Sequence, residues 1–343
     1  MSLGDRKRTI LRAVIIDYID TAEPVGSRTI AKKYEMGISS ATIRNEMADL
    51  EELGYLEQPH TSAGRIPSDK GYRFFVNELM ELQRPSSYEI EAVRNFFDRT
   101  TIDEIDNIIK QISKVLSSIT QYTSAVLSPS VKKSSVKSIQ LIQMSLTDII
   151  AVIVTDTGIV RHCKIKIPKP ISSNTLTAIN NMLNEKLTGL TIEDIDLSVI
   201  SSIQLEMKGY NEILNSIIPV LNESLKSFDC DIFLDGTTNI FHYPEYNDIE
   251  KAKNFLSLLE HKEKLLDIFS EDDSNITVSI GKENIYDEVK DCSIVKASYK
   301  IGDKTLGKIG VIGPTRMNYA KVIGILKYLT DTLNYILKNQ LDE

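Results

Sequence analysis

The chain has 343 residues, of which 42% are hydrophobic, and its formal net charge at pH 7 is −8. This length predicts two or three domains with proper cores, and the composition excludes a chain that is disordered throughout. The acidic balance argues against a protein that binds polyanions indiscriminately.

Two helices are predicted at the N-terminus. Apolar side chains recur at helical spacing from Ile10 to Tyr18, within a helix that is expected to begin at the cap Asp5 and to end near residue 21. Ser27 is expected to cap a shorter helix over residues 28–34.

A third helix is predicted after a turn at Gly37, where glycine can adopt the positive φ that such a corner needs. Ser39 or Ser40 would cap this helix, and Gly54 would end it after Leu53. Two short helices joined by a tight turn are typical of a helix-turn-helix, whose second helix lies in the major groove of DNA.

The next predicted elements are a strand over 55–58, a glycine-containing basic loop over 59–67 and a helix over 68–82. This order favours a winged helix-turn-helix, and the Pro and Ser residues at 85–87 mark a linker that closes the domain at residue 84. Residues 1–84 contain twelve Lys and Arg against thirteen Asp and Glu. DNA binding would therefore depend on local clusters of positive charge.

The rest of the chain alternates helical and strand-rich stretches. Helical patterns occupy residues 88–125, 174–187, much of 192–226 and 248–269, and a final helix follows Pro314. Strands are predicted at 136–145, 149–155, 159–167, 231–236, 276–280, 293–301 and 305–312. Because two strand groups flank a mostly helical block, the order predicts one α+β domain that is interrupted by an insertion.

The candidate base-reading residues lie on the face of the third helix opposite its buried stripe; they are Thr42, Arg44 and Asn45. Arginine can bridge a guanine, asparagine an adenine, and threonine can meet a thymine methyl group. Arg44 has no carboxylate three or four residues away, which favours DNA contact over an ordinary surface ion pair. For Asn45, a hydrogen bond with Asp49 is the alternative. The main expected role of Ser39 and Ser40 is to cap the helix, although their position also places backbone N–H groups where a phosphate could sit.

The loop His60-Thr61-Ser62-Ala63-Gly64-Arg65 is the candidate wing. Its small residues allow a close approach to DNA, and Arg65 could enter a minor groove or hold a phosphate. The alternative is a mobile hairpin tip with a solvated arginine. Lys70 and Arg73 on the following helix could also hold phosphates, or they could pair locally with Asp69.

Several function classes have little support in the sequence. Cys163, Cys230 and Cys292 form no CxxC pair and no zinc-ligand pattern, so they predict buried, reduced thiols. The polar N-terminus predicts no signal peptide, and the longest apolar run, Ile149–Val154, is too short to span a bilayer. We therefore expect a cytoplasmic protein with no membrane partner, no metal, no cofactor and no catalytic residues.

The chain resembles the bacterial heat-inducible transcription repressor family, HrcA, in four segments. They are PVGSRTIAKKY (24–34), SSATIRNEMADLEELGYLEQPHTSAGRIPSDKGYRFFV (39–76), LDGTTNI (234–240) and GVIGPTRMNY (310–319). The combination of SSATIRNEM with HTSAGRIPSDKGYR is far more specific than a lone helix-turn-helix.

The resemblance implies an α+β multidomain fold. Its parts are a winged-helix domain at 1–84, a GAF-like α/β domain in two parts at 85–204 and 286–343, and an inserted, mostly helical dimerisation domain at 205–285. It also implies a homodimer that represses chaperonin and DnaK-type chaperone operons by binding an inverted-repeat operator of double-stranded DNA. Heat would end repression because the repressor denatures or loses the chaperonin as its partner.

The segment GVIGPTRMNY leaves two readings open. Glycines before a helix could cradle an anion beside Arg316, but a tight strand-to-helix turn that docks the final helix is favoured, because no GxxxxGK[ST] pattern is present. At the level of function, the alternatives to a heat-shock repressor are a regulator whose GAF-like domain senses a metabolite and an enzyme with an appended DNA-binding domain.

Overall fold

The computed structural model describes residues 3–61, 63–99, 105–129, 134–158, 160–191, 194–195, 197–206, 210–226, 231–270, 274–302 and 304–341. The chain folds into two compact units. The first comprises Met1–Val126, Ile232–Tyr299 and Lys308–Leu333, and the second comprises Leu127–Asp231, Lys300–Gly307 and Asn334–Glu343.

The first unit begins with the N-terminal module, residues 3–79. Its elements are α1 (Asp5–Thr21), α2 (Ser27–Lys33), α3 (Ser40–Glu52), β1 (Leu56–Glu57), β2 (Ile66–Pro67) and α4 (Asp69–Phe74), which continues into a π-helical turn, η1 (Phe75–Leu79). Ile15, Ile30 and Leu50, one from each of the first three helices, are fully buried in its core. The three predicted helices and the strand near 55–58 are confirmed.

Details at the ends of these elements differ from the predictions. Gly4 and Gly26, in extended conformations, are the N-caps, while Asp5 and Ser27 are already the first residues of α1 and α2. The predicted loop over 59–67 also ends in a strand, because β2 pairs antiparallel with β1 through Leu56–Pro67 and Glu57–Ile66.

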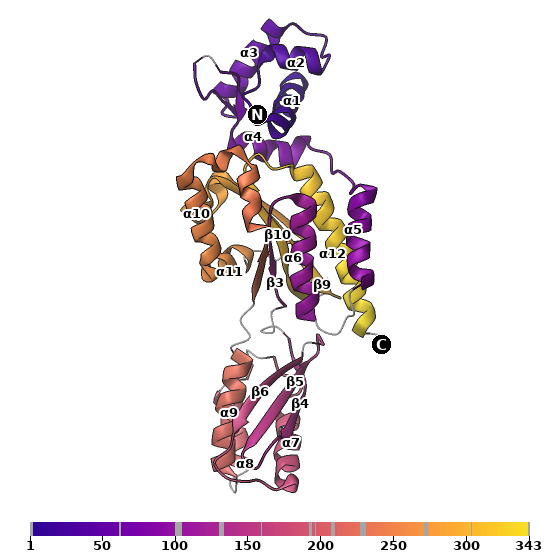
Figure 1. The fold of residues 1–343 in the computed structure, drawn as a ribbon, viewed down its shortest axis with the longest axis vertical. Coiled ribbons are helices and arrows are strands. Elements are labelled where there is room, and N and C mark those ends of the chain that lie inside the picture. The colour runs from indigo at the N-terminus through magenta and orange to yellow at the C-terminus, as the bar shows by residue number, and fades with distance from the viewer. Residues whose placement is uncertain are drawn as a thin grey trace. The chain divides into compact units, whose positions relative to one another are not determined.

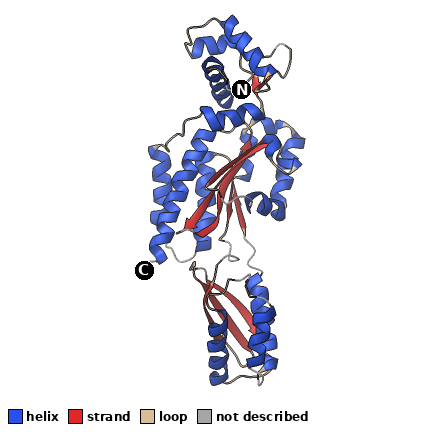
Figure 2. Cartoon of the chain, turned by 180° about the vertical axis from the view of Figure 1, so that it is seen from behind, coloured by secondary structure: helices blue, strands red, loops and turns tan. Residues whose placement is uncertain are grey.

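The first unit also contains the sheet domain, a five-stranded sheet with strand order β7-β3-β10-β9-β8. Its strands are β3 (Thr123–Leu127), β7 (Ile232–Asp235), β8 (Ile276–Ile280), β9 (Cys292–Ile301) and β10 (Lys304–Pro314). Helices lie on both sides of it (Figures 1 and 2); they are α5 (Ser87–Arg99), α6 (Ile105–Thr120), α10 (Ile249–Glu260), α11 (Lys262–Ser270) and α12 (Tyr319–Leu341). Most of β9 and β10 is therefore buried.

The second unit has a three-stranded antiparallel sheet of β4 (Val136–Gln143), β5 (Asp148–Thr155) and β6 (Val160–Lys166). Its helices are α7 (Ser173–Leu187), α8 (Leu197–Glu206) and α9 (Asn211–Lys226) (Figure 1). The side chains of Asn180 and Asn184 on α7 bind the backbone of β4, so α7 covers this edge strand.

The two strand groups that were expected to share one domain lie in different sheets. Strands 136–166 form their own sheet, whereas β9 and β10 pair with β8 and β3. The segment expected as one inserted domain, 205–285, is likewise divided, because its residues up to Asp231 lie in the second unit and those from Ile232 lie in the first.

Two predicted helices are shorter than expected. The helical pattern over 88–125 ends at Thr120, because Gln121 adopts a φ of 61° and the β-branched and small residues after it form β3. The helix over 248–269 is interrupted at His261, which separates α10 from α11. Among the described helices, none is long and apolar enough to cross a membrane.

The segment GVIGPTRMNY forms the predicted strand-to-helix turn. β10 ends at Pro314 and α12 begins at Tyr319. Arg316 in this turn pairs with Glu245 and donates to the backbone of α1, so its guanidinium is occupied by protein groups.

Candidate nucleic-acid interface

The helix expected to read bases is α3, which follows α2 through a turn at Gly37 with φ 65°. Ile43, Met47 and Leu50 are buried and fix the inner face of α3. On the opposite side, Arg44 and Asn45 are exposed, and Thr42 is half-buried. The periodicity of the sequence therefore places these side chains on the solvent face.

The start of α3 is capped as expected from its serines. The Oγ of Ser39 accepts a hydrogen bond from the backbone N of Thr42 at 3.1 Å and lies 3.0 Å from the Thr42 hydroxyl. Ser40 is the first helical residue and is half-buried. Ser39 therefore stabilises the helix end that faces solvent.

Three carboxylates of α3, those of Glu46, Asp49 and Glu51, are neutralised by cations elsewhere in the module. Lys7 on α1 lies 2.6 Å from Glu46 and 2.8 Å from Asp49, and these hydrogen bonds, with Asp49 first, raise the pKa of Lys7. Arg65 lies 2.8 Å from Glu51. Asp49 is thus held by Lys7, and the alternative hydrogen bond between Asp49 and Asn45 is absent among the residues that the structure describes.

Several other cations of the module also have carboxylate partners. Arg8 contacts Glu78 at 3.3 Å, Arg12 contacts Glu81 at 3.5 Å, and Lys33 contacts the buried Asp17 at 2.6 Å.

Arg28, Lys32 and Arg44 differ from these cations, because all three are exposed and none has a carboxylate at ion-pair distance within the described part of the chain. Arg28 and Lys32 are four residues apart on α2 and so share one face of it. Neither residue was among the candidates predicted from the sequence, although this spacing was the available signal.

The candidate wing is the hairpin of β1 and β2, which is tied to α3 and to the segment before α2. The side chain of Arg65 is 18% exposed and pairs with Glu51. Backbone hydrogen bonds of 2.9 Å join Arg65 and Val25 in both directions. An added Cβ on Gly64 would overlap the Val25 carbonyl, so glycine permits this approach. Arg65 is therefore a fixed residue at the base of the hairpin and not a solvated tip.

The loop itself is shaped by Gln58, whose amide donates to the backbone oxygens of Thr61 and Ala63 at 3.1 Å. His60 and Thr61 are exposed. Ser62, the remaining candidate on the loop, lies outside the described residues. His60 and Thr61 are the described candidates at the exposed tip.

A surface cavity brings candidates from α3 and the hairpin together. Its volume is about 480 Å³, and its lining includes Arg44, Met47, Gln58, Thr61 and Arg65. The Nε of Arg65 is buried without a hydrogen-bond partner. The exposed guanidinium of Arg44 on this concave surface suits a phosphate or the acceptor edge of a base, whereas that of Arg65 is paired with Glu51.

The two expected phosphate ligands on α4 have other partners. The Nζ of Lys70 donates to the backbone oxygen of Leu53 at 2.7 Å and lies 4.5 Å from the centre of the Tyr55 ring. Arg73 donates to the Val278 oxygen at 2.6 Å and pairs with Glu283 in the sheet domain. Among the described residues, neither forms the alternative ion pair with Asp69, and neither lines the cavity of Arg44.

The described residues include no cluster of His, Cys, Asp or Glu that could hold a metal ion. Cys292 is buried beside the hydroxyl of Tyr246 at 3.2 Å, and burial raises the pKa of its thiol to about 12. Such a thiol stays protonated and unreactive. Cys163 is half-buried, and Cys230 lies outside the described residues.

Comparison with known proteins adds an independent finding. The family profile described as "HrcA protein C terminal domain" matches residues 106–323. A protein named "Heat-inducible transcription repressor HrcA" from Clostridium perfringens (strain 13 / Type A) is 51% identical over 98% of this chain and 100% of that protein. A protein of the same name from Clostridium tetani (strain Massachusetts / E88) is 49% identical over 99% of this chain and 97% of that protein.

Among solved structures, a hypothetical protein whose crystal structure has a resolution of 2.2 Å is similar with a TM-score of 0.64. It is 23% identical, and the match covers 98% of this chain and 99% of that chain. This likeness supports the fold alone.

Proposed function

The chain belongs to the HrcA family of heat-inducible transcription repressors, and we propose that α3 and the neighbouring hairpin of its N-terminal module bind the operator DNA. The role of heat-shock repressor follows from the full-length similarity. The finer proposal is that residues 3–79 are a winged helix-turn-helix, with α3 in the major groove and the β1–β2 hairpin as the wing.

One observation carries this assignment: within the described part of the chain, exposed cations without carboxylate partners lie on α2 and α3, while Glu46, Asp49 and Glu51 of α3 are paired within the module. Arg44 would read a base edge, with Thr42 and Asn45 beside it, and Arg28 and Lys32 would hold phosphates. Ser39, Ser40, His60, Thr61 and Ser62 stay candidates for backbone contacts. Arg65 would orient the wing. Lys70 and Arg73 would stabilise the module through their contacts with other protein groups.

We propose that two copies bind an inverted repeat, because a single module is nearly neutral in charge and should bind weakly. The open face of the β4-β5-β6 sheet is the best-supported surface for pairing. There Ile150, Val152 and Val154 stay half-buried, and their cross-strand neighbours Ile142 and Val160 are 46% and 54% exposed. An apolar patch of this kind favours association with a second copy.

Two further parts of the proposal derive from the family resemblance. The sheet domain would be GAF-like, with its sheet covered by helices on both sides. The chaperonin would be the partner that maintains the active repressor, in the compartment that holds the chromosome. Unfolded proteins that compete for the chaperonin would then deplete active repressor by mass action.

Binding of the full-length protein to DNA tests the proposal. The measurement is fluorescence anisotropy at fixed salt, with duplexes from the organism's own chaperone promoters and with scrambled duplexes of the same composition. We expect a preference of at least about a thousandfold for the promoter duplex. This preference should disappear on heating and return with added chaperonin. Equal affinity for both duplexes would contradict the proposal, and a metabolite that abolishes binding would favour a ligand sensor instead.

A further inference from the structure

The last turn of α1 is capped by an arginine from a distant part of the first unit. The Nη1 of Arg316 donates a hydrogen bond to the backbone oxygen of Ile19 at 2.9 Å. A helix leaves its last four carbonyls without intrahelical donors, and its C-terminus favours a positive charge. Since α1 has no basic residue in its own last turn, Arg316 supplies both the hydrogen bond and the charge.

Arg316 is held by aromatic and acidic side chains of the sheet domain. Its Nε and Nη2 pair with the Glu245 carboxylate, and its guanidinium carbon lies 5.5 Å from the centre of the Tyr243 ring. Tyr243 stacks on Tyr122 with ring centres 5.3 Å apart. The Arg316 side chain is only 10% exposed. Because these partners hold Arg316 in place, Arg316 couples the end of α1 to the sheet domain.

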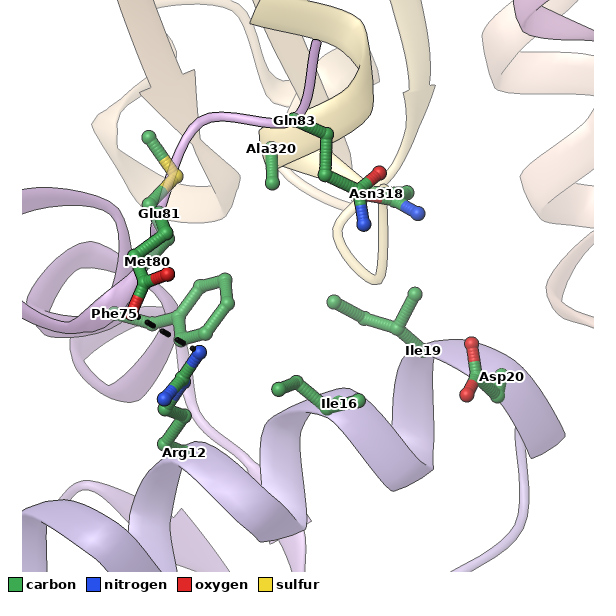
Figure 3. A pocket seen from close by; sticks show the side chains of 10 residues that line it. All are labelled: Arg12, Ile16, Ile19, Asp20, Phe75, Met80, Glu81, Gln83, Asn318 and Ala320. Atoms are coloured by element: carbon green, nitrogen blue, oxygen red, sulfur yellow. Dashed lines mark ion pairs between the residues drawn. The ribbon is translucent and has the colours of Figure 1, made fainter. Parts of the chain in front are cut away.

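The space beside this contact is a cavity. Its volume is about 220 Å³, and it lies between α1, the segment after η1 and the start of α12 (Figure 3). Ile16, Ile19 and Phe75 line it on the N-terminal side, and Asn318 and Ala320 line it from the turn before α12 and from α12. Close packing fixes the angle between two elements, but a cavity does not. The hydrogen bond from Arg316 therefore restrains this end of α1.

A second anchor lies at α4. Arg73 binds Val278 and Glu283, and the backbone N of Lys282 donates to the Asp69 carboxylate at 3.0 Å. Two anchors, one at α4 and one at the end of α1, define the orientation of the N-terminal module. Because α2 and α3 follow directly after α1, the Arg316 anchor also determines the direction of α3.

We propose that Arg316 is a positioning residue for operator recognition, because its contacts with Ile19 and Glu245 fix the orientation of each DNA-binding module within a dimer. This inference rests on the proposed binding of a dimer to an inverted repeat. Two half-sites are read together only when their separation matches that of the two recognition helices. A freed end of α1 would leave each half-site contact intact and would widen the range of half-site spacings that the dimer binds.

The experiment uses the full chain and a series of duplexes. The series contains the operator with its natural spacing, operators with one to five base pairs added or removed between half-sites, and a single half-site. Arg316→Gln and Glu245→Gln are compared with the wild type. The control is Lys264→Ala, which breaks an ion pair of 2.5 Å between Lys264 and Glu288 that lies within the sheet domain.

We expect both test variants to bind the natural operator roughly tenfold more weakly, as partial loss of bivalent binding predicts. Their affinity for the half-site should be unchanged, and they should discriminate less between natural and altered spacings. The control should keep the wild-type spacing profile. Unaltered discrimination in either folded variant, or an equal loss of half-site binding, would overturn the inference. A wild type that fails to prefer the inverted repeat over a half-site would instead overturn the proposed function.

Discussion

Charge pairing at single residues determines which cations of the N-terminal module can meet DNA. Lys7, Lys33 and Arg65 are paired with carboxylates of their own module. Arg28 and Arg44 are exposed and have no such pairs among the described residues. A chain with a net negative charge can therefore still present a local positive surface.

Replacement of Arg44 tests direct reading of bases. We expect Arg44→Ala to weaken operator binding by about 1–3 kcal/mol, the cost of losing a bidentate contact with a base, and to relax specificity at one position. Anisotropy titrations of operator and scrambled duplexes measure this loss. Arg94→Ala, at an exposed arginine on α5, is the matched control. An operator affinity that stays at the wild-type value would exclude Arg44 as a base reader.

Two adjacent lysines on α2 should give opposite results. Lys32→Ala should weaken binding to operator and scrambled DNA alike and lower the slope of log affinity against log salt by about one, as loss of one phosphate contact predicts. Lys33→Ala removes the partner of the buried Asp17, so it should lower the unfolding temperature and leave the salt slope unchanged. Identical salt slopes for Lys32→Ala and the wild type would remove Lys32 from the interface.

At the scale of elements, the β1–β2 hairpin is positioned by its close approach to Val25. We expect Gly64→Ala to separate the hairpin from Val25, because the new Cβ would overlap the Val25 carbonyl, and to cost roughly 1–3 kcal/mol of stability. Operator affinity should fall together with the stability. Gly4→Ala is the control, since its Cβ would meet nothing within 4 Å. Chemical unfolding and anisotropy measure the two effects, and a Gly64→Ala variant with wild-type stability would contradict the assigned contact.

The anchor at α4 should respond to acid. Burial acts to raise the pKa of Glu283, but hydrogen bonds from Arg73 and the Ile280 backbone outweigh it, so the pKa is lowered. The stability that Glu283 contributes is thus present above its unfolded-state pKa of about 4.3 and is lost as the pH falls through the lower folded-state value.

Glu283→Gln should therefore lose less stability than the wild type when the pH falls from 6 to 3, as measured by the unfolding midpoint. Glu91→Gln, at an exposed carboxylate on α5, should behave like the wild type. A Glu283→Gln variant with the same acid sensitivity as the wild type would show that the ion pair with Arg73 contributes no pH-dependent stability.

Local patterns predicted most elements and the solvent-facing position of the candidate base readers. The buried stripe of Ile43, Met47 and Leu50 was enough to place Arg44 on the exposed face of α3. In contrast, β3 was missed because Gln121 turns the chain at positive φ without a glycine to signal it. The partner of Arg73 lies 210 residues away, and no spacing rule within a helix reaches that far.

At the scale of the whole molecule, two near-neutral modules should bind DNA well only when they are joined. Val152 lies at the centre of the open face of the β4-β5-β6 sheet, where it is half-buried between Gln140 and His162. A glutamate there would keep water contact in a single copy but would be buried and unpaired against a second copy. An unpaired buried charge of this kind costs several kcal/mol.

We therefore expect Val152→Glu to convert a dimer into a folded monomer in sedimentation experiments. The unfolding temperature of the single copy should be preserved. Its operator affinity should fall to that of a single half-site, by about 10²–10⁴-fold, because bivalent binding is lost. Asn181→Glu, at an exposed position on α7, is the matched control and should remain dimeric. If Val152→Glu sediments as a dimer with wild-type operator affinity, the pairing surface lies elsewhere. If it is monomeric and still binds the inverted repeat with wild-type affinity, a single module is sufficient for repression, and association of two copies is not required for it.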